Sequence, residues 1–232
     1  MADDLTGVDA PADDEAGKTL SSRRLEAYSD GVFAIAATLL VLDLSVASLH
    51  LPSNPTSAAL WGALGAGWGK FLSFGVSFLI LGILWSVHVR QFEFVERVDQ
   101  TVLTLNTFRL LGVVIVPFTT TLTDTYSDTV PGRFLLPLNF FYVVALGYLQ
   151  WLYSTSPHRN LAPRISDYYR RISRRNGLIA TVMAAVVAIA SIWIGSVAFL
   201  LFLLNNVFDA FDRRAAMKEP GRRGRTERRA AP

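Results

Sequence analysis

The sequence contains no cysteine, so it excludes disulfide bonds and metal sites built from thiolates. Charged side chains are scarce inside several long apolar runs, although they are dense between these runs. Walker loops, nucleophile elbows and His-Glu-x-x-His helices are absent from the sequence, and we therefore predict that the chain is not an enzyme. The net charge is only +3, and the basic residues gather in connections and tails, so nucleic-acid binding is not expected.

Apolar residues make up 51% of the 232 residues and come in long blocks. This pattern is typical of a polytopic, all-α membrane protein. We predict six transmembrane helices, the last of them short, at residues 22–47, 61–89, 101–122, 134–153, 178–194 and 197–211. The predicted domains are an acidic, disordered tail over 1–21, a six-helix membrane domain over 22–212 and an Arg-rich, disordered tail over 213–232. The first tail lacks a basic segment followed by an apolar one, so it is not a signal peptide.

Lys and Arg residues are unevenly distributed over the connections between the blocks. They concentrate after the second block, in the connector over 154–175 that follows the fourth block, and in the C-terminal tail. The positive-inside rule therefore predicts a multi-pass protein of the cell membrane with both termini in the cytoplasm. Six spans satisfy this parity, whereas five would not. The Gly-rich first turns of the second block are a candidate for a separate interfacial segment, with Trp61 and Trp68 as anchors.

The first block carries an ionisable side chain, Asp30, next to Ser29 and just before its longest apolar run. A carboxylate about two turns inside a membrane helix needs a partner or water. His88, Asn106 and Arg109 lie near the cytoplasmic ends of their own predicted helices, so they are candidate partners. The sequence therefore predicts a polar cluster that holds the cytoplasmic end of the first helix. The alternative is that Ser29 and Asp30 cap a helix that begins only at Gly31.

Two further polar residues leave alternatives open. Arg109 is either a buried pairing residue or a side chain that extends to the membrane interface. His88 lies just before the charged connection that carries Glu93 and Glu96, and all three carry metal-binding side chains. One histidine with two carboxylates on a charged connector is more typical of a solvated surface, so no metal site is predicted.

A stripe of branched apolar residues runs along the first block. Ile35, Leu39 and Leu42 are spaced four and three positions apart, which puts them on one face of a helix, and Thr38 lies beside them. Most such stripes are ordinary packing or a lipid-facing surface, although a pore-lining helix shows the same pattern. Taken alone, the residues favour the first interpretation.

The start of the first block resembles a family signature. Arg24-x-x-x-Tyr28-Ser29-Asp30 is similar to the Arg-x-x-x-Phe-Ser-Asp motif of the transmembrane protein 175 family, which contains the lysosomal potassium channel of animals and its bacterial relatives. The agreement continues in the next two blocks, at Trp85, His88, Asn106 and Pro117-Phe118-Thr119. Tyr28 stands where the family usually has Phe, and it keeps the ring while adding a hydroxyl.

The resemblance implies a homotetramer of six-helix chains around a central pore, which four copies of the first helix line. It implies that the pore is narrowest at Ile35, with Leu39 and Leu42 outward of it and Thr38 one turn on. It also implies an inter-helix polar network outside the ion path, formed by Arg24, Tyr28, Ser29, Asp30, His88 and Asn106.

The function that the resemblance implies is a potassium-selective, leak-like cation channel with an apolar constriction in place of a carbonyl filter. Such a neck excludes water when narrow and admits a partly hydrated ion when wider. Potassium loses its hydration shell more cheaply than sodium, so an apolar neck favours it modestly. The predicted partners are other copies of the chain, potassium ions and the lipid bilayer, with no cofactor. The alternatives are a secondary cation transporter or cation/proton exchanger, in which Asp30 and His88 would titrate, and a membrane scaffold.

Overall fold

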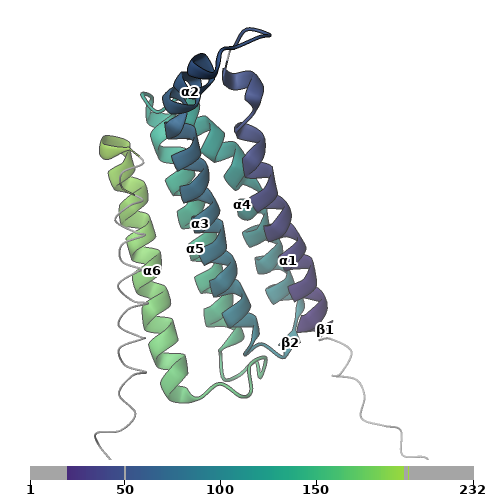
Figure 1. Cartoon of the computed structure of the whole chain (residues 1–232). Coiled ribbons are helices and arrows are strands. Elements are labelled where there is room, and N and C mark those ends of the chain that lie inside the picture. Colours follow the sequence, from purple (N-terminus) through teal and green to yellow (C-terminus); the bar gives the residue numbers. More distant parts are fainter. Residues whose placement is uncertain (1–19, 50, 196–197, 199–232) are drawn as a thin grey trace, which may run out of the picture.

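The structure, a computed structural model of the chain, describes residues 20–49, 51–195 and 198. Most of both predicted tails lies outside these residues, and so does the predicted sixth helix over 197–211, apart from Ala198. The long helices run side by side in one bundle, with α1 (Ser22–Leu39) at one edge and α6 (Asp167–Ile194) at the other (Figure 1).

The described part of the chain is mostly helical, as its apolar blocks indicate. The other helices are η2 (Leu40–Asp43), η3 (Val46–Leu49), α2 (Ser57–Ala66), α3 (Trp68–Phe92), α4 (Gln100–Thr125) and α5 (Val130–Ser154), where η marks a 3-10 helix. Two short strands, β1 (Leu20–Ser21) and β2 (Arg97–Val98), pair antiparallel, with Leu20 opposite Val98. Leu20 and Ser21 belong to the predicted N-terminal tail, so the ordered part of the chain begins before the first helix.

Five helical segments of the described residues are long and apolar enough to cross a membrane, namely 22–43, 68–92, 100–125, 130–154 and 167–194. The prediction of a multi-pass membrane protein is therefore confirmed. The sixth span and the orientation of the termini stay predictions. We call the end of the bundle where α1 and α6 begin the basic end, because Arg90, Arg170 and Arg174 lie there. The opposite end, beside α2, is the far end (Figure 1).

Two predicted boundaries are wrong. The predicted first helix extends to residue 47, but α1 ends at Leu39 and continues as the tighter η2, which is a common way for a helix to end. The connector predicted over 154–175 ends early, because α6 begins at Asp167. The Ser166 side chain caps this helix by accepting a hydrogen bond from the backbone N–H of Tyr169. The basic residues of the first turns resemble a loop in the sequence, so they conceal the start of the helix.

The second apolar block is divided at Gly67 into α2 and α3, as its Gly-rich first turns indicated. Thr56 caps α2, since its hydroxyl oxygen accepts a hydrogen bond from the backbone N–H of Ala59 at 3.2 Å. The rings of Trp61 and Trp68 are exposed. Exposed indoles beside a short apolar helix are consistent with the predicted interfacial segment.

The bundle is organised around α4, which packs against α1, α3 and α5, while α6 packs against α5. The main core consists of buried apolar residues from these helices, including Phe33 of α1, Leu81 of α3, Val113 of α4 and Val143 of α5. Gly112 lets α4 and α5 approach closely, because a Cβ atom at that position would lie 2.6 Å from Cγ2 of Val143. The inner face of α1 packs on α4, which this close contact joins to α5, and on α3.

Candidate functional site

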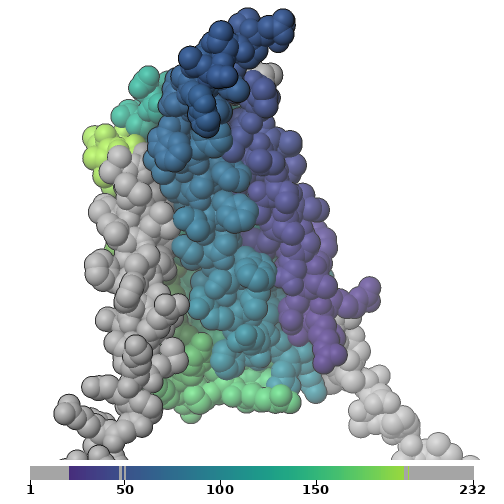
Figure 2. Space-filling view, viewed as in Figure 1, coloured from purple at the N-terminus to yellow at the C-terminus, as the bar shows by residue number. Residues whose placement is uncertain are grey.

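The two faces of α1 have opposite environments. Its buried side chains are spaced three or four positions apart, so they form one stripe against α3 and α4; they include Leu25, Ser29, Phe33 and Ala36, and Leu40 of η2 continues the stripe. The outer side of the helix borders no other helix of the described chain at the edge of the bundle (Figure 2).

A second stripe, which we call the exposed face of α1, consists of Arg24, Tyr28, Gly31, Ile35, Thr38, Leu39 and Leu42. The side chains of Ile35 and Leu42 are 60% and 68% exposed, and Leu39 is 40% exposed. The Thr38 hydroxyl donates a hydrogen bond to the carbonyl oxygen of Ile35 at 2.9 Å. The structure therefore brings all four predicted pore residues to one surface of a single chain, which is the arrangement that a shared path requires.

Beneath this face, a chain of buried amide and hydroxyl groups joins three helices. The side-chain amide of Asn106 on α4 donates a hydrogen bond to Oγ of Ser29 at 3.0 Å. Ser29 in turn donates to the carbonyl oxygen of Leu25 at 2.8 Å, and Gln150 on α5 donates to Oδ1 of Asn106 at 3.4 Å. Ser29 and Asn106 are fully buried. Because unpaired buried polar groups are costly, these bonds fix how far α1 is rotated about its axis.

Asp30 has a different environment from its neighbour Ser29. Its carboxylate accepts a hydrogen bond from Nε1 of Trp85 on α3 at 2.8 Å, and the side chain is exposed. Helix α1 begins at Ser22, so the alternative in which Asp30 caps a helix that starts at Gly31 is wrong. Within the described chain, no hydrogen bond or ion pair joins the side chains of Arg24 or Tyr28 to another residue.

His88 and Arg109 form a second buried polar group. The Arg109 guanidinium donates to Nδ1 of His88 at 3.2 Å and to Oε1 of Gln91 at 2.9 Å. Since arginine only donates, the His88 ring accepts through Nδ1. The His88 ring also packs against Phe33 and Phe92, with ring centroids 5.6 Å and 4.5 Å apart. Arg109 is thus a buried pairing residue, and the alternative that it extends to the interface is wrong.

The residues that suggested a metal site are separated in the structure. His88 is buried next to Arg109, whereas Glu96 forms an ion pair with Arg164 at 2.9 Å on the surface. Across the described residues, no group of three or more His, Asp or Glu side chains is arranged to hold a metal ion.

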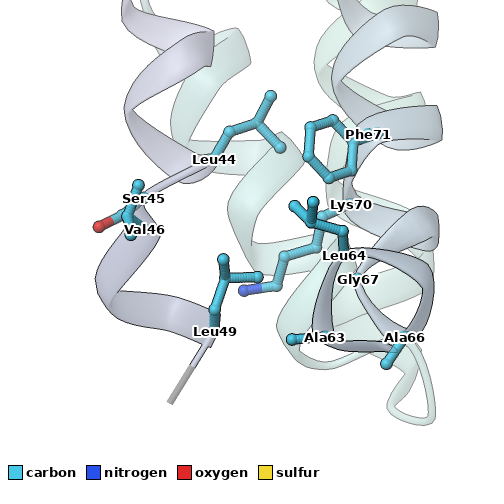
Figure 3. Close-up of a pocket in the computed structure, with 10 residues that line it drawn as sticks. All are labelled: Leu44, Ser45, Val46, Leu49, Ala63, Leu64, Ala66, Gly67, Lys70 and Phe71. Atoms are coloured by element: carbon cyan, nitrogen blue, oxygen red, sulfur yellow. The ribbon is translucent and has the colours of Figure 1, made fainter. Parts of the chain in front are cut away.

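At the far end, beyond the exposed face of α1, a cavity of about 360 Å³ lies between η3, α2 and the start of α3 (Figure 3). Its walls are mostly apolar, and Leu44, Leu64 and Phe71 converge on it, while Lys70 is its one charged lining residue. No acidic residue lines the cavity, and its lining has no cluster of polar groups that would orient a ligand, so we assign it no ligand.

Comparisons with known proteins show which family the chain resembles. Residues 24–117 match the family described as the endosomal/lysosomal potassium channel TMEM175. The predicted family resemblance is confirmed. A protein of Streptomyces collinus named a potassium channel is 45% identical over 105 residues, which cover 45% of this chain and 48% of that protein. The mouse endosomal/lysosomal proton channel TMEM175 is 41% identical over 97 residues, which cover 40% of this chain and 19% of that protein.

A solved structure extends the likeness beyond the matched segment. The crystal structure of a lysosomal potassium-selective channel TMEM175 homolog from Chamaesiphon minutus has a TM-score of 0.55 and 25% sequence identity, covering 80% of this chain and 98% of that one. The sequence matches span about half the length of the bacterial relatives, and they include α1, α3 and most of α4. The exposed face of α1 lies in this matched part, and so do both buried polar groups except for Gln150 on α5.

Three residues of the site were not predicted from the sequence, namely Gln91, Trp85 as the partner of Asp30, and Gln150. Gln150 offered a signal, since it and Asn139 are the two amide side chains in an otherwise apolar block. Such a residue in a membrane helix needs a partner in the bundle. Gln91 offered none, because it lies next to the charged connection where polar residues are expected.

Proposed function

We propose that the protein is a potassium-permeable cation channel formed by four chains, whose exposed α1 faces line the path. The observation that carries the proposal is the stripe of Ile35, Thr38 and Leu42 on a helix whose opposite face is buried and hydrogen-bonded. We infer that further copies of the chain, arranged around a symmetry axis, cover this edge helix. The names of the relatives, which include both potassium and proton channels, support an ion path.

The chemistry of the path follows from the side chains on this face. Four Ile35 side chains would supply no oxygen ligand, so the constriction would gate by wetting and dewetting. The Thr38 hydroxyl donates its proton to the backbone, which leaves its oxygen lone pairs available to an ion. Those oxygens would replace part of the water that a passing potassium ion loses. Selectivity over sodium would then be modest, because no rigid ring of carbonyls is involved.

Under this proposal, the predicted polar network divides into residues that bond within one chain and residues that would contact a neighbouring chain. Ser29 and Asn106 hold α1 within its own chain, and their buried hydrogen bond supports this role. Arg24, Tyr28 and Asp30 are exposed in one chain, so their further partners would belong to a neighbouring chain. Charged groups at such an interface would favour one arrangement of the chains over others.

The exchanger alternative receives no specific support. Asp30 is bonded to Trp85 at the surface, and His88 is buried beside Arg109, so the two titratable groups have separate partners. A proton or ion relay through both would have to cross the core of the bundle.

Potassium flux from liposomes tests the proposal. Purified protein would be reconstituted into vesicles loaded with potassium chloride, and the release of potassium down its gradient would be followed. We expect flux that depends on the protein, and single-channel steps in a planar bilayer. Flux that saturates with potassium and needs a counter-ion on the other side would favour an exchanger, and no flux would contradict both.

A further inference from the structure

A cavity of about 350 Å³ lies between α3, α4, α5 and α6 at the basic end of the bundle. Its volume is in the range of ligand sites in proteins. No residue of α1 lines it, so it is separate from the exposed face of α1. Two arginines line it, Arg90 and Arg109, and no acidic residue does.

The polar and apolar lining residues are separated along the axis of the bundle. On α3, which runs towards the basic end, Ile83 and Val87 come first and Arg90 follows. On α6, which runs away from that end, the polar lining residues Tyr169, Ser173 and Asn176 come before Ala180, with the apolar Ile172 among them. Two helices of opposite direction therefore give the same gradient, with polar groups near the membrane surface and apolar groups deeper.

Arg109 supplies a buried positive charge at this cavity. Arg109 is 1% exposed. Its hydrogen-bond partners are the His88 ring and the Gln91 side-chain amide, and neither carries a negative charge. Its Nε–H is buried and has no hydrogen-bond partner among the described residues. Gly147 makes room for the guanidinium, because a Cβ atom there would lie 2.8 Å from the Cζ atom of Arg109. A buried charge without a counter-charge is costly, so an anion in the cavity would stabilise it.

We propose that this cavity binds an anionic phospholipid. The phosphate lies at the polar end with Arg90 and Arg109, and an acyl chain extends along Ile83, Val87 and Val144. Charge complementarity argues for the anionic headgroup, because the two arginines face no carboxylate in the cavity. The apolar inner half argues for the acyl chain, because free phosphate would leave that half unfilled. This proposal concerns binding alone and does not depend on the channel function.

The probes are phosphatidylglycerol, phosphatidylcholine and inorganic phosphate, each titrated into the purified full-length protein in a neutral detergent. The unfolding temperature is the readout, because a ligand that binds only the folded protein raises it. We expect a saturable increase with phosphatidylglycerol and none with phosphatidylcholine or phosphate. Equal increases with both lipids, or a phosphate effect as large as that of phosphatidylglycerol, would overturn the proposal.

Three variants locate the binding. Arg90→Gln should raise the half-saturating concentration of phosphatidylglycerol roughly tenfold, the effect of losing one charge-assisted hydrogen bond. Arg175→Gln is the matched control, since Arg175 is exposed at the same end of the bundle and does not line the cavity. Ala180→Phe should weaken the lipid effect by filling the apolar half, while both arginines stay in place. Equal weakening by Arg90→Gln and Arg175→Gln would indicate diffuse attraction to the basic end and would contradict the proposal, as would unchanged binding in Ala180→Phe.

Discussion

Asn106 of α4 donates a hydrogen bond to Ser29 of α1 at 3.0 Å, and both side chains are fully buried between the helices. We predict that Asn106→Ala destabilises the fold by about 1–3 kcal/mol, because it leaves buried partners unpaired. Thr104→Ala is the control, since Thr104 is exposed on the same helix, and it should change stability by less than about 0.5 kcal/mol. Thermal unfolding of the purified variants measures both effects. Equal stabilities would show that the buried bond does not hold α1.

Asp30 and Trp85 share one hydrogen bond, so Asp30→Ala and Trp85→Phe remove the same contact from a single chain. If Asp30 also pairs with a neighbouring chain, Asp30→Ala should weaken the oligomer and Trp85→Phe should leave it intact. Size-exclusion chromatography with light scattering, over a dilution series, separates the two outcomes. If the two variants behave identically, Asp30 makes no contact with a neighbouring chain that the oligomer needs.

The assembly itself is measurable. Each chain has a mass of 25.6 kDa, and the proposal predicts a particle of four chains in mild detergent. Native mass spectrometry should show this species and lose it when the exposed face of α1 receives a charge, as in Gly31→Asp. A monomer that still conducts potassium would contradict the shared path.

The constriction is tested by Ile35→Asn, which replaces four sec-butyl groups with four amides in the proposed pore. Water would then wet the neck, so resting flux should rise and discrimination between potassium and sodium should fall. Reversal potentials under bi-ionic conditions measure the discrimination. Ile189→Asn on α6 is the control, because Ile189 is 57% exposed against 60% for Ile35 and lies at the opposite edge of the bundle.

Ala37, two positions from Ile35, is unsuitable as a control site because it packs against the main core. If Ile35→Asn assembles normally and keeps its selectivity, the neck is not at Ile35. Leu39, on the same face, would then be the next residue to substitute.

Gly147 and Gly75 form a matched pair of helical glycines. A Cβ atom at Gly147 would meet the Arg109 guanidinium at 2.8 Å, whereas one at Gly75 would meet nothing within 4 Å. Gly147→Ala should therefore lower the unfolding temperature, and Gly75→Ala should leave it unchanged or raise it slightly through the better helix propensity of alanine, about 0.5–1 kcal/mol. A neutral Gly147→Ala would mean that Arg109 moves without cost.

The sequence predicted the described spans because a long run of apolar residues has few alternatives to a membrane helix. It also predicted that Ile35, Thr38, Leu39 and Leu42 share a surface, since helical periodicity fixes relative direction. It could not predict which face would be buried. Ser29 and Asp30 are adjacent and differ by about 100° of rotation, and that rotation alone separates a buried hydroxyl from an exposed carboxylate.

The partners of the buried residues depend on tertiary packing. The contact between Arg109 and His88 joins α4 to α3, and the contact between Asn106 and Gln150 joins α4 to α5. The local sequence of each helix does not specify the angle at which the neighbouring helices pack against it. The start of α6 was missed for a different reason, because its first turns are charged and resemble the loop before them.

The antiparallel pair β1–β2 has a mechanical consequence for α1. Leu20 and Ser21 lead directly into α1, and their partners Val98 and Arg97 lead almost directly into α4. The strand pair therefore joins the starts of the two helices. The Ser29–Asn106 bond adds a second attachment about two turns above it. A twist of α1 alone would have to break both attachments. We therefore expect a force applied to the first helix to be transmitted to α4, so that the two helices move together.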